Sequence, residues 1–145
     1  MTDDELSRFA ASIEAEVNSG FSNVVLDHAM NPRNVGRLEH EDGFAAFTGP
    51  CGDTMIISIR VSSGIITDAR FWTDGCGTSI ASGSIVTELA KGKVLDDAML
   101  IGQAEVLEAL EGLPEESEHC ALLAATTLHM AVDDYRGTNS SGEDK

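Results

Sequence analysis

The sequence is poor in aromatic residues, in basic residues and in long hydrophobic runs. Aromatic residues make up 5% of the 145 residues and hydrophobic residues 42%, so we expect a mainly aliphatic core. Nine lysines and arginines stand against 25 aspartates and glutamates, which gives a net charge of -16 at pH 7. This balance argues against nucleic acid and anionic membrane surfaces as partners, because both are bound by basic side chains. No hydrophobic run approaches the roughly 20 residues that span a bilayer.

Cysteines are also few, and their arrangement limits their use. Cys51, Cys76 and Cys120 are odd in number and lie far apart, which argues against a disulfide framework. The acidic first residues lack the basic flank and apolar centre of a signal peptide, so we expect a cytoplasmic protein with reduced thiols. No C-x-x-C zinc knuckle and no G-x-x-x-x-G-K-[ST] phosphate loop occurs. The three thiols are left for metal ligation, nucleophilic chemistry or burial as small hydrophobic residues.

The length fits one domain with a short extension at each end. Residues 1–20 are predicted to form an amphipathic helix, because apolar residues recur there at helical spacing; they are Leu6, Phe9, Ile13 and Val17. The domain itself is predicted over residues 21–136. The polar, Gly/Ser-rich tail at 137–145 is predicted to be disordered.

Hydrophobic alternation predicts a β-hairpin in the middle of the chain. A period-2 pattern places four apolar residues on one face, namely Met55, Ile57, Ile59 and Val61, with Thr54, Ile56, Ser58 and Arg60 between them. Residues 62–64 form a short connection, and residues 65–73 make the returning strand. The preceding segment 37–50 is predicted to be irregular. Helices are expected at 21–30, 79–91, 96–101, 105–111 and 120–136, with Asp96 as an N-cap and Gly112 as a stop.

Two of the cysteines lie in glycine-bounded turns at the ends of this hairpin. Cys51 belongs to Gly49-Pro50-Cys51-Gly52-Asp53, and Cys76 to Gly75-Cys76-Gly77. Because a hairpin returns the chain to the end of the sheet where it began, we expect both thiols at that end. Cys76 and Cys120 also stand at predicted helix starts, where the helix dipole favours the thiolate.

Five residues are candidate ligands of a metal centre: Cys51, Asp53, Cys76, His119 and Cys120. Thiolate suits zinc and iron–sulfur clusters, and imidazole suits zinc and iron. The alternatives are a zinc-binding module and a Cys–His transferase or hydrolase. For the enzyme, His119 and Cys120 are expected to point in different directions, since they are adjacent at a helix start. The other histidines are predicted to be structural; they are His28, His40 and His129.

At these positions the sequence resembles the IscU/NifU-type iron–sulfur cluster scaffold family. The matching motifs follow the family's order and extend over residues 21–135. They are Asn31-Pro32-Arg33-Asn34-Val35-Gly36, Pro50-Cys51-Gly52-Asp53, Asp68-Ala69-Arg70-Phe71, Asp74-Gly75-Cys76-Gly77 with Ile80-Ala81-Ser82, and His119-Cys120.

The resemblance implies an α+β domain in which a three-stranded antiparallel sheet is flanked by helices and the cysteines gather at one end. It implies a scaffold rather than an enzyme, which assembles a cluster, usually [2Fe–2S], on Cys51, Cys76 and Cys120. Either His119 or Asp53 would supply the fourth ligand, and Asp53 would keep the cluster labile. Cys120 would be the persulfide acceptor. Zinc would be an alternative occupant of the cluster-free site.

The resemblance also implies partners. These are a cysteine desulfurase as the sulfur donor and apo iron–sulfur proteins as acceptors, with ferredoxin or an iron donor as further candidates. The family's Leu-Pro-Pro-Val-Lys segment, which a dedicated chaperone reads, is Leu113-Pro114-Glu115-Glu116-Ser117 here. This replacement argues against the specialised chaperone and adds acidic charge before His119.

Overall fold

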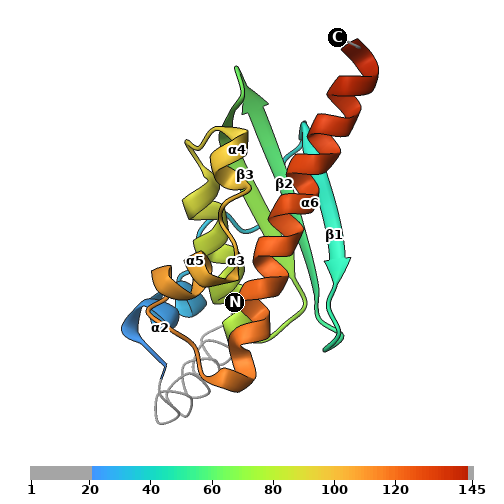
Figure 1. Ribbon diagram of the computed structural model, residues 1–145. Helices are drawn as coiled ribbons and strands as arrows, with labels where there is room; N and C mark the ends of the chain where they lie inside the picture. Colours follow the sequence, from blue (N-terminus) through green and yellow to red (C-terminus); the bar gives the residue numbers. More distant parts are fainter. Residues whose placement is uncertain (1–20, 144–145) are drawn as a thin grey trace.

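The computed structural model describes residues 21–143, so the helix predicted at 1–20 lies outside the described part of the chain. The described residues form an α+β fold in which helices pack on a three-stranded antiparallel sheet (Figure 1), which confirms the predicted fold class. In chain order the elements are α2 (Asn23–Met30), β1 (Gly43–Thr48), β2 (Thr54–Ser62), β3 (Ile65–Thr73), α3 (Gly77–Ala90), α4 (Leu95–Ala98), α5 (Gln103–Ala109), a 3-10 turn (Glu115–Ser117) and α6 (Glu118–Glu143).

The predicted hairpin is the centre of the sheet, whose strand order is β1-β2-β3. Ser63 and Gly64 connect β2 to β3 with φ values of 54° and 76°, a left-handed turn that matches the twist of a tight hairpin. Met55, Ile57 and Ile59 are fully buried, as the alternation predicts. Val61, the next residue of that pattern, is only partly buried, because the pairing register shifts between Arg60 and Val61.

Strand β1 contradicts the prediction that residues 37–50 are irregular. Its composition hides it, since Ala45 and Ala46 are weak strand formers. Tertiary contacts hold it instead: β1 pairs with β2 from Gly43↔Ile59 to Thr48↔Thr54, and α6 packs against it. At Gly43 a Cβ atom would lie 2.4 Å from the Ala131 carbonyl oxygen, so glycine allows this close approach of helix and strand.

Helices α3 and α6 cover the inner face of the sheet. Helix α3 packs on β3, and α6 crosses β1 and β2 (Figure 1). A Cβ at Gly83 of α3 would lie 2.4 Å from the ring of Phe71, which is 1% exposed. The small residues of α3 therefore bring its backbone close to β3, and this closeness fixes the start of α3 beside the end of β3.

Two helix boundaries differ from the predictions. Val94 is the N-cap of α4, so Asp96 lies in the first turn rather than at the cap, where its charge still suits the helix dipole. Helix α6 continues to Glu143, past the predicted end at Arg136, so the predicted disordered tail is wrong over the described part of 137–145. Extending an existing helix costs far less than starting one, which explains why polar residues continue it.

Gly112 ends the helical segment after α5, as predicted. Its φ is 94°, and its N–H donates to the carbonyl of Leu107 at 2.8 Å, the bond pattern of a glycine C-cap. None of the described helices is long and apolar enough to cross a membrane.

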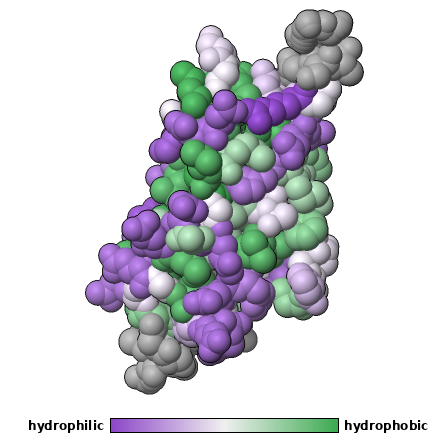
Figure 2. Space-filling view, in the orientation of Figure 1, coloured by the Kyte–Doolittle hydropathy of each residue, from purple (hydrophilic) through white to green (hydrophobic). Residues whose placement is uncertain are grey.

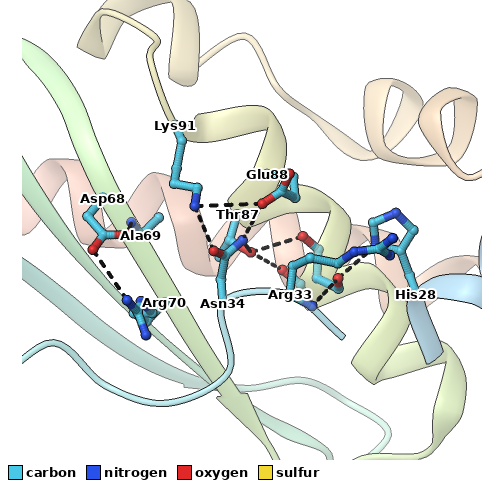
Figure 3. Close-up of polar contacts among 11 residues, drawn as sticks. His28, Arg33, Asn34, Asp68, Ala69, Arg70, Thr87, Glu88 and Lys91 are labelled. Atoms are coloured by element: carbon cyan, nitrogen blue, oxygen red, sulfur yellow. Dashed lines mark hydrogen bonds and ion pairs between the residues drawn. The ribbon is translucent and has the colours of Figure 1, made fainter. Parts of the chain in front are cut away.

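The segment 31–36, which lies between α2 and β1 along the chain, is a structured loop that hydrogen-bonds to both α3 and β3 (Figure 3). The Arg33 N–H donates to the Ser84 hydroxyl at 2.9 Å, and the Asn34 amide donates to Thr87 at 3.1 Å. Lys91 Nζ donates back to Asn34 Oδ1 at 2.8 Å. Asn34 has a φ of 65°, a conformation that asparagine tolerates better than most residues. On the other side, the Phe71 N–H of β3 donates to the Asn34 carbonyl at 2.8 Å and the Gly36 N–H donates to the Phe71 carbonyl at 2.8 Å, so this loop holds β3 and the C-terminal half of α3 in fixed relation.

Candidate metal centre

Cys51 lies in the tight turn between β1 and β2. Gly52 has a φ of 95°, and its N–H donates to the Gly49 carbonyl at 3.0 Å, while the Gly49 N–H donates to the Asp53 carbonyl at 2.9 Å. These bonds leave the Cys51 side chain exposed at the rim of the sheet. Asp53 follows at the foot of β2 and is partly buried.

Cys76 is the N-cap residue of α3, which confirms its predicted place at a helix start. A hydrogen bond with Cys120 lowers the pKa of Cys76 to about 4, despite the opposing effect of desolvation. Hydrogen bonds from the Thr78 hydroxyl and from the Thr78 and Ser79 N–H groups lower it further. Cys76 is therefore the thiolate of the cysteine pair, as expected for a sulfur at a helix N-terminus.

Cys120 behaves differently, and the prediction that it too favours thiolate is wrong. It is 1% exposed, and its hydrogen bond to Cys76 and its burial both raise its pKa above the ordinary value. Because Cys76 carries the negative charge, Cys120 keeps its proton and donates it. The hydrogen bond to Cys76 and burial thus affect the pKa of Cys120 more than the helix dipole does.

Two hydroxyl groups connect the candidate ligands, and the sequence reasoning missed both. Thr78 Oγ1 lies 3.1 Å from Cys76 Sγ and 3.4 Å from Cys120 Sγ. Ser79 Oγ lies 3.4 Å from Cys120 Sγ and donates to Asp53 Oδ2 at 3.2 Å. The signal was present in the sequence, since two hydroxyl residues follow Gly75-Cys76-Gly77 in the first helical turn. Their role emerges only when α6 and the β1–β2 turn are placed beside that turn.

All five candidate ligands meet at this end of the sheet. Ligand atoms of Cys51, Asp53 and His119 lie within 4.8 Å of one another. His119 Nε2 also lies 3.7 Å from Cys120 Sγ, so the expectation that these neighbours point apart is wrong. The hairpin argument is confirmed, because Cys51 and Cys76 lie beside the terminal strand pair Met55↔Thr73.

The other described histidines have partners outside this site. His28 Nδ1 hydrogen-bonds the Ser84 hydroxyl at 2.7 Å, and His129 Nε2 donates to the Ile101 carbonyl at 2.9 Å. His40 is exposed in the segment before β1. Each of the three thus lies apart from the thiol cluster.

An apolar cavity of about 250 Å³ opens beside the candidate ligands. Cys51 and His119 contribute to its wall, and the rest is mainly apolar; the lining also includes Phe47, Gly49, Pro50, Leu122, Leu123 and Thr126. Figure 2 shows hydrophilic residues at the lower end of the visible face as well as at its top and left side, and the segment before His119 carries Glu115, Glu116 and Glu118. A partner that reaches the thiols therefore meets an apolar pocket and an acidic surface.

The fold and the site define a class of protein, namely an α+β domain with a thiol-rich centre assembled from separate turns and helix starts. The chain belongs to the NifU-like N terminal domain family, whose family model matches residues 20–141. This finding confirms the family resemblance drawn from the motifs.

Curated relatives and solved structures agree with this membership. Iron-sulfur cluster assembly scaffold protein IscU 1 of Archaeoglobus fulgidus is 47% identical over 116 residues, 79% of this chain and 76% of that protein. Iron-sulfur cluster assembly scaffold protein IscU of Escherichia coli K12 is 46% identical over 121 residues, 80% of this chain and 94% of that protein. The N-terminal part of a NifU-like protein from Brucella abortus shares the fold with a TM-score of 0.65 and 19% identity, over 80% of this chain and 94% of that one.

Proposed function

We propose that this protein is a scaffold on which an iron–sulfur cluster is assembled and from which it is passed to acceptor proteins. The observation that carries the proposal is the meeting of Cys51, Cys76 and Cys120 with Asp53 and His119 at one end of the sheet. The scaffold names of the curated relatives support the same role, and they favour a carrier over an enzyme.

In this proposal the three cysteines are the thiolate ligands of the cluster, which we take to be [2Fe–2S]. Thiolates are the usual ligands of iron–sulfur clusters, and the fourth ligand is Asp53 or His119. The ligands come from the β1–β2 turn, the start of α3 and the start of α6. Movement of one of these segments would loosen the site, and a carboxylate is a hard ligand for this soft chemistry. Both features favour release of the cargo to apo iron–sulfur proteins.

Cys120 is the proposed persulfide acceptor, with a cysteine desulfurase as sulfur donor. Its thiolate attacks the outer sulfur of the donor persulfide, the donor S–S bond breaks, and the donor cysteine leaves as a thiolate. Because Cys120 is 1% exposed in the cluster-free protein, the start of α6 must move to admit the donor. Docking of the donor and removal of the Cys120 proton are therefore expected to occur together.

Other partners follow from the same role. Ferredoxin or an iron donor would supply electrons or iron, and zinc would occupy the thiols when the cluster is absent. The specialised chaperone is not among the proposed partners, because the segment before His119 carries Glu115 and Glu116 where the family has Pro-Val. All three cysteines are free, which suits a reducing compartment such as the cytoplasm.

Anaerobic reconstitution tests the proposal. We expect the full chain, supplied with ferrous iron, cysteine and a cysteine desulfurase, to develop visible sulfur-to-iron absorption with matching iron and sulfide contents. Cys51→Ala, Cys76→Ala and Cys120→Ala should each abolish the absorption, whereas Thr127→Ala, a buried change distant from the thiols, should not. Absorption that survives all three cysteine changes would overturn the proposed ligands.

Two rival functions have distinct outcomes in the same experiment. Chelator-resistant zinc with no cluster formation would indicate a zinc-binding module. A Cys–His enzyme draws support from the 3.7 Å contact between His119 and Cys120. Yet the buried Cys120 has a raised pKa, which disfavours it as a resting nucleophile. That enzyme would show a burst of product and one hyperreactive thiol.

A further inference from the structure

Ser79 is a fully buried serine whose hydroxyl reaches two candidate ligands. Its Oγ donates to Asp53 Oδ2 at 3.2 Å and lies 3.4 Å from Cys120 Sγ. A hydroxyl has one proton to donate, and an ionised carboxylate can only accept. The Ser79 proton is therefore committed to Asp53 rather than to Cys120.

The orientation of the Asp53 carboxylate depends on this hydrogen bond. The bond from the Gly49 N–H at 2.9 Å reaches the Asp53 main-chain carbonyl and leaves the side chain unrestrained. Within residues 21–143, Ser79 is the side chain that donates a hydrogen bond to the carboxylate. Without that bond a partly exposed aspartate can rotate among its staggered conformers.

Gly75 provides independent evidence that this pair is built into the fold. A Cβ at position 75 would lie 2.5 Å from Ser79 Oγ and 2.9 Å from Asp53 Oδ2. Gly75 does not have a positive φ, so its backbone conformation does not require glycine. The lack of room for a side chain beside Ser79 and Asp53 explains the glycine instead. The turn before Cys76 thus leaves room for the Asp53–Ser79 pair and for nothing larger.

We propose that Ser79 is a positioning residue that aims the Asp53 carboxylate at the metal. The inference rests on the proposed role of Asp53 as a ligand and adds the group that orients it. Removing the hydrogen-bond partner of a metal ligand typically lowers the metal affinity by about 10- to 100-fold. Ser79 therefore sets how tightly the carboxylate holds its metal, and with it how readily the cargo leaves.

Zinc affinity of the full chain measures this role without cluster chemistry. Metal-free protein is prepared anaerobically, and the Kd for Zn²⁺ is obtained by competition with a chromophoric chelator. Ser79→Ala is expected to raise that Kd about tenfold. The matched control is Ser82→Ala, which removes another buried hydroxyl of α3 that donates only within the helix, to the Thr78 carbonyl at 2.8 Å. We expect the control to keep the wild-type Kd.

A second background separates positioning of Asp53 from an effect on Cys120. In Asp53→Ala protein, adding Ser79→Ala should change the Kd by less than about twofold, because the group that Ser79 orients is gone. Gly75→Ala, whose methyl group displaces the Asp53–Ser79 pair, should raise the Kd for Zn²⁺ as Ser79→Ala does. Thermal unfolding of each variant verifies that it is folded.

The outcomes distinguish this inference from the proposed function. An unchanged Kd in Ser79→Ala, or a tenfold loss that persists in the Asp53→Ala background, would overturn the role of Ser79 while the metal site stands. Failure of the wild-type chain to bind Zn²⁺ at all would overturn the metal site and the positioning role together.

Discussion

The two ends of α3 carry polar clusters of different character. At the C-terminal half, Ser84 and Thr87 accept hydrogen bonds from the loop 31–36 at 2.9 and 3.1 Å, and Ser84 also contacts His28 of α2 at 2.7 Å. At the N-terminal end, Thr78 and Ser79 meet two sulfurs at 3.1 to 3.4 Å and a carboxylate at 3.2 Å. The first cluster fixes the helix to the sheet.

The second cluster leaves its groups available for exchange. Sulfur is a weak hydrogen-bond partner, and the thiols can give up these contacts for a metal. Cys51 and Cys76 are also exposed, whereas the loop 31–36 is hydrogen-bonded to α3 on one side and to Phe71 of β3 on the other. One helix thus combines a rigid anchor with a replaceable set of contacts, which is the division that a temporary carrier needs.

The largest expected difference concerns thiol reactivity. In metal-free protein at pH 6, iodoacetamide should alkylate Cys76 at least about 100-fold faster than Cys120, since an ordinary or raised thiol pKa leaves under about 1% thiolate at that pH. Mass spectrometry of tryptic peptides follows each site. The rate at Cys76 should stay level down to about pH 5, because its pKa is about 4. Protein unfolded in urea is the control, and a Cys76 rate that climbs tenfold per pH unit above pH 6 would contradict the assignment.

The next difference concerns stability. Asn34→Ala removes the side-chain hydrogen bonds of Asn34 with Thr87 and Lys91 and places alanine at a φ of 65°. We therefore expect a loss of about 2 kcal/mol in the free energy of unfolding. Cys51→Ala, in the exposed turn, should change it by less than about 0.5 kcal/mol. Urea denaturation measures both. Equal losses would show that the cysteine end stabilises the fold as much as the anchor does.

The smallest expected effect is the pH response of the anchor, where His28 meets Ser84 at 2.7 Å. Burial, and then the charge of Arg33, lower the pKa of His28 below 6.5, although Asp27 and Glu88 act in the opposite direction. As pH falls below about 6.5, His28 becomes protonated in the unfolded chain while it stays neutral in the folded one. The contribution of His28 to the free energy of unfolding is therefore complete above that pH and declines below it.

The urea midpoint at pH 7.5 and pH 5.5 measures this decline. Wild-type protein should lose more of its midpoint between the two pH values than His28→Gln, which cannot titrate. An equal fall of the urea midpoint in both proteins would show that His28 does not cause the pH dependence and that the acidic residues do.

Much of the fold could be predicted from local patterns. Period-two alternation identified β2, the short connection at 62–64 predicted β3 as the returning strand, and Gly112 marked the end of the segment after α5. Strand β1 was missed by those patterns, because Ala45 and Ala46 form a strand only when β2 and α6 hold them. The end of α6 was missed because helix propagation outweighs the weak propensity of its polar residues.

The sequence by itself identified the candidate cysteines: Cys51 and Cys76 lie in glycine-bounded turns, and Cys76 and Cys120 lie at helix starts. The tertiary structure decided how these groups share their protons. Cys76 holds the charge, Cys120 keeps its proton, and Ser79 turns its hydroxyl to Asp53. Protonation and hydrogen-bond direction depend on distances of a few ångströms between segments more than 20 residues apart, and only packing of α3, α6 and the β1–β2 turn sets those distances.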